Sequence, residues 1–150
     1  GEQQLLGLLK AIADGTHGLP VVFPVHPRTA KNLREAGKTL PSMHYVDPLG
    51  YLEFNYLVKH ARGVITDSGG ITEETTVLGV PCLTLRDNTE RPETVTIGTN
   101  ELIGTDPRKL PPALARVMAG QWKKGAIPPK WDGKAAERIV GHLKDLLAGQ

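Results

Sequence analysis

The segment from Thr66 to Glu74, with the sequence TDSGGITEE, carries the residues best suited to chemistry. It lies where an apolar run, expected as a buried strand, gives way to a helical pattern. Ser68, Gly69 and Gly70 would then present backbone N–H groups at a helix N-terminus, where the helix dipole favours negative charge. The glycines would let a phosphate approach the main chain closely. Glu74, one turn into the helix, could accept hydrogen bonds from two vicinal ribose hydroxyls.

The same segment also fits a purely structural interpretation. Asp67 or Ser68 would cap the helix, the glycines would form a tight turn, and Glu73 and Glu74 would favour the helix dipole. A strand followed by two glycines and a helix is not a specific signal, so this segment alone leaves both interpretations open.

A second polar segment, Leu85–Glu93, follows the next expected strand along the chain. Arg91 in this loop could grip a phosphate with the planar fork of its guanidinium, a geometry that lysine lacks. Taken alone, the loop also fits a solvated connection that is held by internal ion pairs.

Two further segments follow expected strands. In the run Asp47–Phe54, the main chain near Leu49 could contact the edge of a base and Phe54 could pack on it, although Phe54 also fits the core stripe of a helix. His26 follows the first strand and fits either a ligand-binding group or a structural hydrogen bonder.

Hydrophobic periodicity indicates alternating strands and helices around these segments. Strands are expected at residues 20–25, 43–46, 63–66 and 81–85, with weaker candidates at 94–97 and 101–103. Helices are expected at residues 2–14, 29–37, 51–61, 71–78, 107–119 and 134–147. This alternation predicts an α/β fold in which helices flank a parallel sheet. The first strand, a continuous apolar run, is expected to be buried on both faces.

The carboxyl ends of parallel strands meet at one edge of a sheet, where such sheets bind their ligands. The polar segments described above should therefore converge. Because one of them is suited to phosphate, their convergence predicts a nucleotide site. This architecture usually opens on a strand whereas the chain opens on a helix, so a further segment is expected upstream.

The composition narrows the class of protein. The 150 residues include 18 Lys or Arg and 16 Asp or Glu, and the formal charge of +2 does not favour a nucleic-acid or membrane partner. No apolar run approaches the roughly 18 residues of a membrane span. The single cysteine, Cys82, cannot form an internal disulfide and is expected to be an inert core thiol, so a reducing cytoplasm is the expected compartment. No Cys/His cluster has the spacing of a metal site.

Taken together, the segments match a known family. The runs DSGGITEE (67–74) and LGVPCLTLRDNTERPE (78–93) closely resemble the non-hydrolysing UDP-N-acetylglucosamine 2-epimerases. The runs HPR (26–28), PLGYLEF (48–54) and WDGKAAER (131–138) support the match, which extends over essentially the whole chain. The resemblance implies a C-terminal, Rossmann-like UDP-binding domain over residues 1–150, one half of a glycosyltransferase-B type fold, with the N-terminal domain absent from this chain.

The resemblance also implies roles for individual residues. The substrate-binding positions that it assigns by motif are Ser68, Gly69 and Gly70 on the diphosphate, Glu74 on the ribose, Arg91 on the phosphates, and Leu49 (through its backbone) and Phe54 beside the uracil. The family interconverts UDP-GlcNAc and UDP-ManNAc by eliminating UDP to a glycal and re-adding it after C2 is protonated on the other face. Arg91 would be catalytic, because negative charge builds on the departing UDP.

Further expectations follow from the same resemblance. The proton-transferring carboxylates of the family lie in the N-terminal domain, so the chain alone is expected to be inactive. No cofactor or metal is implied, and the full-length enzyme is expected to be a cytoplasmic homodimer that serves polysaccharide biosynthesis.

In several bacterial members a histidine at the position of His26 helps to bind a second, activating substrate molecule. There the motif is usually His-x-Asn-Pro, whereas Pro27, Arg28 and Thr29 follow His26 here.

Two other functions remain open. The first is the donor half of a glycosyltransferase, against which the Thr-Glu-Arg-Pro-Glu loop argues. The second is a stand-alone nucleotide-binding module without catalysis, which the length of the chain favours.

Overall fold

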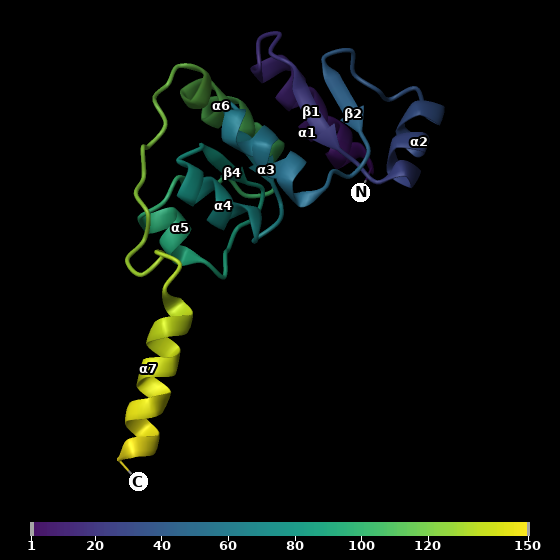
Figure 1. Ribbon diagram of the computed structural model, residues 1–150. Coiled ribbons are helices and arrows are strands. Elements are labelled where there is room, and N and C mark those ends of the chain that lie inside the picture. The colour runs from purple at the N-terminus through teal and green to yellow at the C-terminus, as the bar shows by residue number, and fades with distance from the viewer. Residues whose placement is uncertain (1, 150) are drawn as a thin grey trace.

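Five parallel strands form two small sheets in the computed structural model, which describes residues 2–149 (Figure 1). Strands β1 (Val21–Pro24) and β2 (Met43–Val46) pair with each other in one sheet. Strands β3 (Val64–Thr66), β4 (Cys82–Thr84) and β5 (Asn100–Leu102) form the second, with β4 in the middle. The chain thus has the expected α/β architecture, although its strands pair as two sheets rather than as one.

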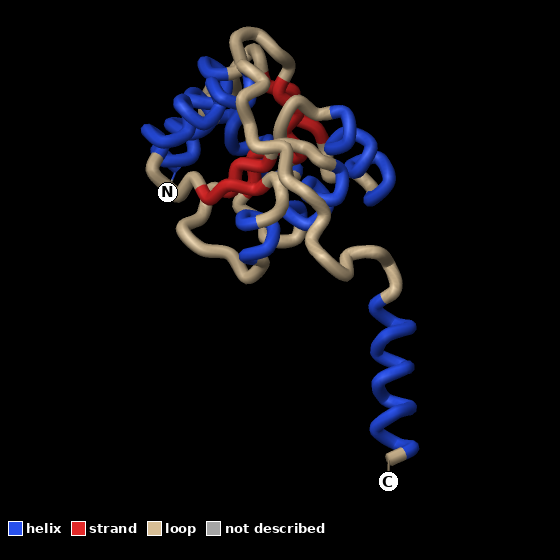
Figure 2. The backbone as a smooth tube through the Cα atoms, turned by 90° about the vertical axis from the view of Figure 1, so that its left-hand side faces the viewer, coloured by secondary structure: helices blue, strands red, loops and turns tan. Residues whose placement is uncertain are grey.

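Helices connect the strands and cover the sheets (Figures 1 and 2). Their bounds are α1 (Glu2–Gly15), α2 (Pro27–Glu35), α3 (Tyr51–His60), α4 (Ile71–Leu78), α5 (Pro92–Thr96), the 3-10 turn η1 (Pro107–Lys109), α6 (Leu110–Met118) and α7 (Ala135–Ala148). Glycines with positive φ follow several helices; Gly79, for example, ends α4 in the left-handed conformation that favours glycine. No helix within residues 2–149 is long and apolar enough to span a membrane.

The main hydrophobic core lies where α1 and α6 pack over β4. Its buried members are Ile12, Leu83, Ile103, Leu110, Ala113, Leu114, Val117 and Trp122. Leu83 and Leu110 are completely inaccessible to solvent. Partly buried Val21 of β1 and Ile65 of β3 pack against the same cluster, so the two sheets share one core.

A buried polar network fixes the elements behind the Leu85–Glu93 loop. The Thr84 hydroxyl donates to Asn100 Oδ1 over 2.6 Å, and Asn100 Nδ2 donates to Thr94 Oγ1 over 3.2 Å. All three residues are buried, and they join β4, β5 and α5. Because each of these hydrogen bonds is shielded from water, the network anchors both ends of the loop.

Two expectations about strands are wrong. Residues 94–97 do not form a strand: α5 occupies Pro92–Thr96, because Pro92 presets the first helical turn and the Thr94 hydroxyl donates to the Arg91 carbonyl over 2.7 Å. The strand near residues 20–25 is not buried on both faces, since Val22 is 43% exposed. Within the described residues β1 pairs with β2 alone, which leaves it less covered than a central strand.

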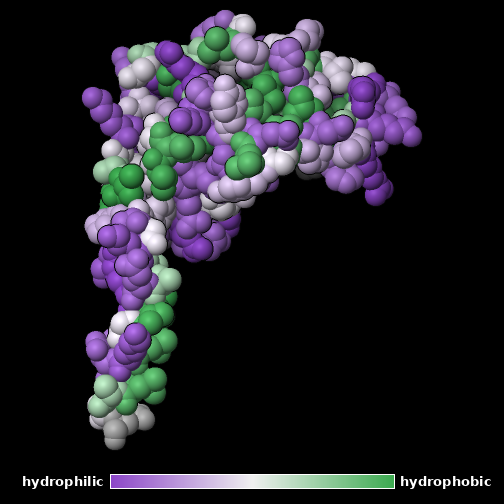
Figure 3. Space-filling view, in the orientation of Figure 1, coloured by the Kyte–Doolittle hydropathy of each residue, from purple (hydrophilic) through white to green (hydrophobic). Residues whose placement is uncertain are grey.

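Helix α7 stands away from the rest of the molecule after the long segment that follows α6 (Figures 1 and 2). It has no buried residue, and a green stripe of apolar side chains runs along it in Figure 3. The exposed apolar residues of α7 are Ile139, Val140, Leu143, Leu146 and Leu147.

Candidate functional site

The Ser-Gly-Gly turn joins β3 to α4 as the sequence predicts. The backbone N–H of Ser68 donates to Thr66 Oγ1 over 3.0 Å, which folds the chain back as it leaves the strand. Helix α4 begins at Ile71 with Gly70 as its N-cap, and no side chain caps it. The interpretation in which Asp67 or Ser68 caps this helix is therefore wrong. The start of α4 remains available to an external anion.

The turn and the Leu85–Glu93 loop begin side by side. Thr66 pairs with Thr84 at the carboxyl ends of β3 and β4, and the Leu85 N–H donates to the Thr66 carbonyl over 2.8 Å. The predicted convergence of these two segments is confirmed. It follows from parallel pairing, which places successive strand ends at the same edge.

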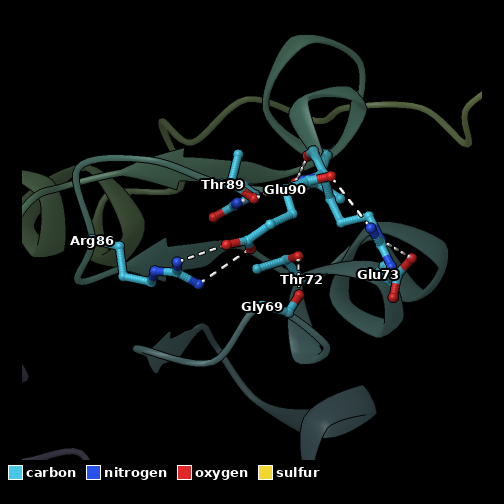
Figure 4. Close-up of polar contacts among 9 residues, drawn as sticks. Gly69, Thr72, Glu73, Arg86, Thr89 and Glu90 are labelled. Atoms are coloured by element: carbon cyan, nitrogen blue, oxygen red, sulfur yellow. Dashed lines mark hydrogen bonds and ion pairs between the residues drawn. The ribbon is translucent and has the colours of Figure 1, made fainter.

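The two segments meet directly over Gly69 (Figure 4). A Cβ at this position would lie 3.4 Å from Glu90 Oε2 and 3.8 Å from Arg86 Nη1. The Thr72 hydroxyl donates to the Gly69 carbonyl over 2.6 Å and so holds the turn against α4. A bare backbone at Gly69 thus lies next to one guanidinium and one carboxylate.

Arg86 and Glu90 form an ion pair within the loop. Arg86 Nη2 donates to Glu90 Oε1 over 2.8 Å, and Nη1 donates to Oε2 over 3.3 Å. Arg86 Nη2 also donates to Asn88 Oδ1 over 3.3 Å. The hydrogen bonds from Arg86 lower the pKa of the Glu90 carboxyl from its ordinary value. The alternative of a loop held by an internal ion pair is therefore correct for these two residues.

Arg91, the residue that sequence reasoning assigns to the phosphates, contacts Glu73 of helix α4. Its Nε donates to Glu73 Oε1 over 2.9 Å, and its Nη1 donates to the carbonyl of Glu90 over 3.3 Å. The Arg91 side chain is 48% exposed, so it remains partly accessible to solvent. The loop is thereby tied to the helix that follows the Ser-Gly-Gly turn.

Glu74 lies beside Glu73 in an open groove of about 590 Å³ between α3 and α4. Tyr51, Tyr56 and Trp131 line the same groove. Within residues 2–149 the Glu74 side chain forms no hydrogen bond or ion pair with the rest of the chain, whereas its neighbour Glu73 is occupied by Arg91. The carboxylate of Glu74 is therefore free to accept hydrogen bonds from a ligand.

The remaining candidates do not line this groove. Leu49 is half-buried and lines a shallow apolar surface on α3, next to the groove, and Phe54 is half-buried on the same helix. Neither residue lines the groove that contains Glu74. His26 is the N-cap of α2, where its Nδ1 accepts a hydrogen bond from the Arg28 N–H over 3.3 Å. His26 therefore makes a structural hydrogen bond, as one of its two interpretations predicts.

The family model for UDP-N-acetylglucosamine 2-epimerase matches residues 1–144, nearly the whole chain. The chain belongs to the UDP-N-acetylglucosamine 2-epimerase family. It is 45% identical over 130 residues to the UDP-N-acetylglucosamine 2-epimerase of Methanocaldococcus jannaschii, covering 82% of this chain and 34% of that protein. It is 36% identical over 151 residues to the Escherichia coli K12 enzyme of the same name, covering 97% of this chain and 40% of that protein.

The fold agrees with the family. A crystal structure of the M. jannaschii epimerase in complex with UDP-GlcNAc and UDP superimposes with a TM-score of 0.78 and 39% identity, covering 96% of this chain and 41% of that one. The fold is the Rossmann-like half of a glycosyltransferase-B type architecture. The chain spans about two-fifths or less of the length of these relatives.

Sequence reasoning missed three side chains at this site: Glu73, Arg86 and Glu90. Arg86 is the second residue after the end of β4, and the rule that such sheets bind ligands at strand ends would have singled it out. The pairing of Glu73 with Arg91, which are 18 positions apart, has no local signal in the sequence. No group of His, Cys, Asp or Glu within the described residues has the arrangement of a metal site.

Proposed function

We propose that residues 1–150 are the C-terminal, UDP-binding domain of an epimerase that interconverts UDP-GlcNAc and UDP-ManNAc. One observation carries the proposal: in a member of this family, the uncapped start of α4 meets an arginine-containing loop over the bare backbone of Gly69. Backbone N–H groups at a helix start and nearby guanidinium groups are the donors that a diphosphate requires.

Each candidate residue has a place in this proposal. Ser68, Gly69 and Gly70 bind the diphosphate through their backbone, and Arg91 contacts its oxygens from the loop. Glu74 accepts hydrogen bonds from the ribose hydroxyls, which its unpaired carboxylate in the α3–α4 groove supports. The half-buried Leu49 and Phe54 flank the uracil on the side of α3.

The proposed reaction inverts C2 of the sugar in two steps. A base removes the C2 proton while the C1–O bond to UDP breaks on the opposite face, and the electron pair of that bond leaves with the diphosphate. The resulting C1=C2 double bond is then protonated at C2 from the other face as the UDP oxygen re-adds to C1. Negative charge grows on the diphosphate as it departs, so donors that are fixed around it lower the barrier.

Within this proposal the proton-transferring groups belong to an N-terminal domain that completes the cleft in the full-length enzyme. A cytoplasmic homodimer that serves polysaccharide biosynthesis is proposed for that enzyme on the family resemblance. His26, the exposed N-cap of α2, is proposed to contact a second substrate molecule in that complete protein.

Calorimetric titration of the 150-residue chain tests the proposal. UDP should bind, and uridine should bind more weakly because it lacks the diphosphate. The same preparation should not interconvert UDP-GlcNAc and UDP-ManNAc when proton NMR follows the sugar. Equal affinity for UDP and uridine would contradict the diphosphate site, and epimerisation by the homogeneous chain would contradict the assignment of proton transfer to another domain.

A further inference from the structure

The carboxylate of Glu90 lies next to the bare backbone of Gly69 in the Ser-Gly-Gly turn. Its Oε2 lies 3.4 Å from the position that a Cβ on Gly69 would take, and Figure 4 shows it between Arg86 and the turn. Both of its oxygens accept hydrogen bonds from the Arg86 fork. A carboxylate held in this way presents two oxygens to one guanidinium, which is the arrangement that a phosphate also adopts.

The two partners differ in how firmly the protein holds them. The Arg86 side chain is 32% exposed, against 64% for Glu90. Arg86 has a second acceptor in Asn88 Oδ1, whereas Arg86 is the sole side-chain partner of the Glu90 carboxylate within residues 2–149. When the pair separates, Arg86 therefore keeps a hydrogen bond beside Gly69 and Glu90 can turn out into solvent.

On this geometry we infer that Arg86 is a second phosphate-binding arginine and that Glu90 is its resident counter-anion, which the diphosphate of a nucleotide displaces. The inference rests on the proposed function, because it concerns the same diphosphate. The two arginines of the loop have different ion-pair partners. Arg91 is held to α4 by Glu73, whereas Arg86 pairs with Glu90 of the loop itself. Exchange of one anion for another keeps Arg86 paired in both states.

Displacement of Glu90 has a cost that a substitution can remove. Glu90→Gln keeps the shape of the side chain but abolishes its charge, so the diphosphate no longer competes with a carboxylate for Arg86. We expect UDP to bind about three- to tenfold more tightly to this variant, in line with the modest strength of exposed ion pairs. Arg86→Gln should weaken UDP binding, and adding Glu90→Gln to it should change the affinity by less than about twofold, because the competition needs the arginine.

The matched control is Glu93→Gln, which removes one negative charge at the C-terminal end of the loop, in the first turn of α5. The Glu93 side chain forms no ion pair or hydrogen bond within residues 2–149, so its loss reports the general effect of charge on UDP affinity. Uridine, which lacks phosphate, should bind all variants equally. Melting temperatures of each variant verify folding, and Glu90, on the surface, is expected to be replaceable without loss of the fold.

The outcomes are distinct. The inference is supported if Glu90→Gln binds UDP more tightly than Glu93→Gln does and if this gain is lost when Arg86 is also replaced. Weaker binding by Glu90→Gln would show that Glu90 positions Arg86 rather than competing for it, and an effect equal to that of Glu93→Gln would show only a general charge effect. Either result overturns the inference while UDP binding by the wild type leaves the proposed function intact. Absence of UDP binding by wild type and variants alike would overturn both.

Discussion

Arg91 and Glu73 join the Leu85–Glu93 loop to helix α4, with Arg91 Nε donating to Glu73 Oε1 over 2.9 Å. Glu73 is the third residue of α4, and Glu74, the proposed ribose acceptor, is the next one. Glu73, which holds the proposed phosphate-binding Arg91, and Glu74, which is proposed to bind the ribose, are therefore neighbours on one helix. This connection fixes the loop against the helix that begins at the Ser-Gly-Gly turn.

Substitution of Arg91 tests its proposed catalytic role in the full-length enzyme. Arg91→Ala should lower turnover and catalytic efficiency together, because the proposed contact would strengthen as charge builds on departing UDP. Arg91→Lys should not restore activity, since lysine keeps the charge but loses the planar fork. Steady-state kinetics on both variants measure this.

Glu73→Gln is the control for the Arg91 variants, because it weakens the ion pair while leaving the guanidinium in place. If Arg91 serves only to hold the loop, Glu73→Gln and Arg91→Ala should lower the melting temperature similarly and leave UDP affinity unchanged. Near-wild-type turnover in Arg91→Ala would end the catalytic assignment.

Glu74→Ala should weaken UDP binding by about 1.5–3 kcal/mol, the range for hydrogen bonds to a charged group. The loss should vanish with 2′,3′-dideoxy-UDP, which lacks the hydroxyls that Glu74 is proposed to contact. Calorimetric titration of both ligands into the wild type and the variant makes the comparison. An equal loss for the two ligands would refute the ribose role.

Cys82 should be chemically silent in the folded chain. It is completely inaccessible in β4, and burial raises the pKa of its thiol, an effect that hydrogen bonds with Thr75 and Thr84 only partly offset. A thiol reagent at pH 8 should therefore label the chain only after unfolding in guanidinium. Labelling of the native chain at the rate of a free thiol would contradict the buried position.

The raised pKa of Cys82 also predicts a pH dependence of stability. Above the ordinary cysteine pKa of about 8.5 the unfolded chain loses the thiol proton and the folded chain keeps it. The free energy of unfolding should therefore fall as pH rises above this value. Cys82→Ala, which has no thiol, should show a smaller fall over the same pH range in denaturant titrations.

The core beneath α6 gives a prediction of stability alone. Leu110 is fully buried between α1 and β4, so Leu110→Ala should cost about 2–5 kcal/mol of unfolding free energy. Leu143→Ala, on the exposed stripe of α7, should change the stability of this chain by no more than about 0.5 kcal/mol. Denaturant unfolding of both variants measures these losses. Equal losses of unfolding free energy in the two variants would contradict this packing.

The sequence predicts best where local signals agree. Helix α4 has the expected bounds, because a run of strand residues, two glycines and a final Gly79 all mark its ends. Strand β2 also has the expected bounds, at Met43–Val46. The error at residues 94–97 arose because their β-branched side chains favour a strand, whereas Pro92 and the buried Thr94 hydrogen bonds fix a helical turn.

The side-chain pairing at the site lies beyond such reasoning. The sequence shows four charged residues in the loop between β4 and α5 but not which of them face one another. Whether Arg91 pairs with Glu73, Glu90 or Glu93 depends on how α4 packs beside the loop, which is a tertiary property. The same holds for the burial of β1, which depends on what pairs with its second edge.

The central claim, that the Ser-Gly-Gly turn binds the diphosphate of UDP, is tested most directly by following backbone amide signals of the 150-residue chain by ¹⁵N NMR during a UDP titration. The amides of Ser68, Gly69, Gly70 and Ile71 should show the largest shifts with UDP and little change with uridine, because only the diphosphate reaches the start of α4. Amide shifts that are the same for both ligands, or that leave these four residues unmoved while UDP binds elsewhere, would contradict the assignment.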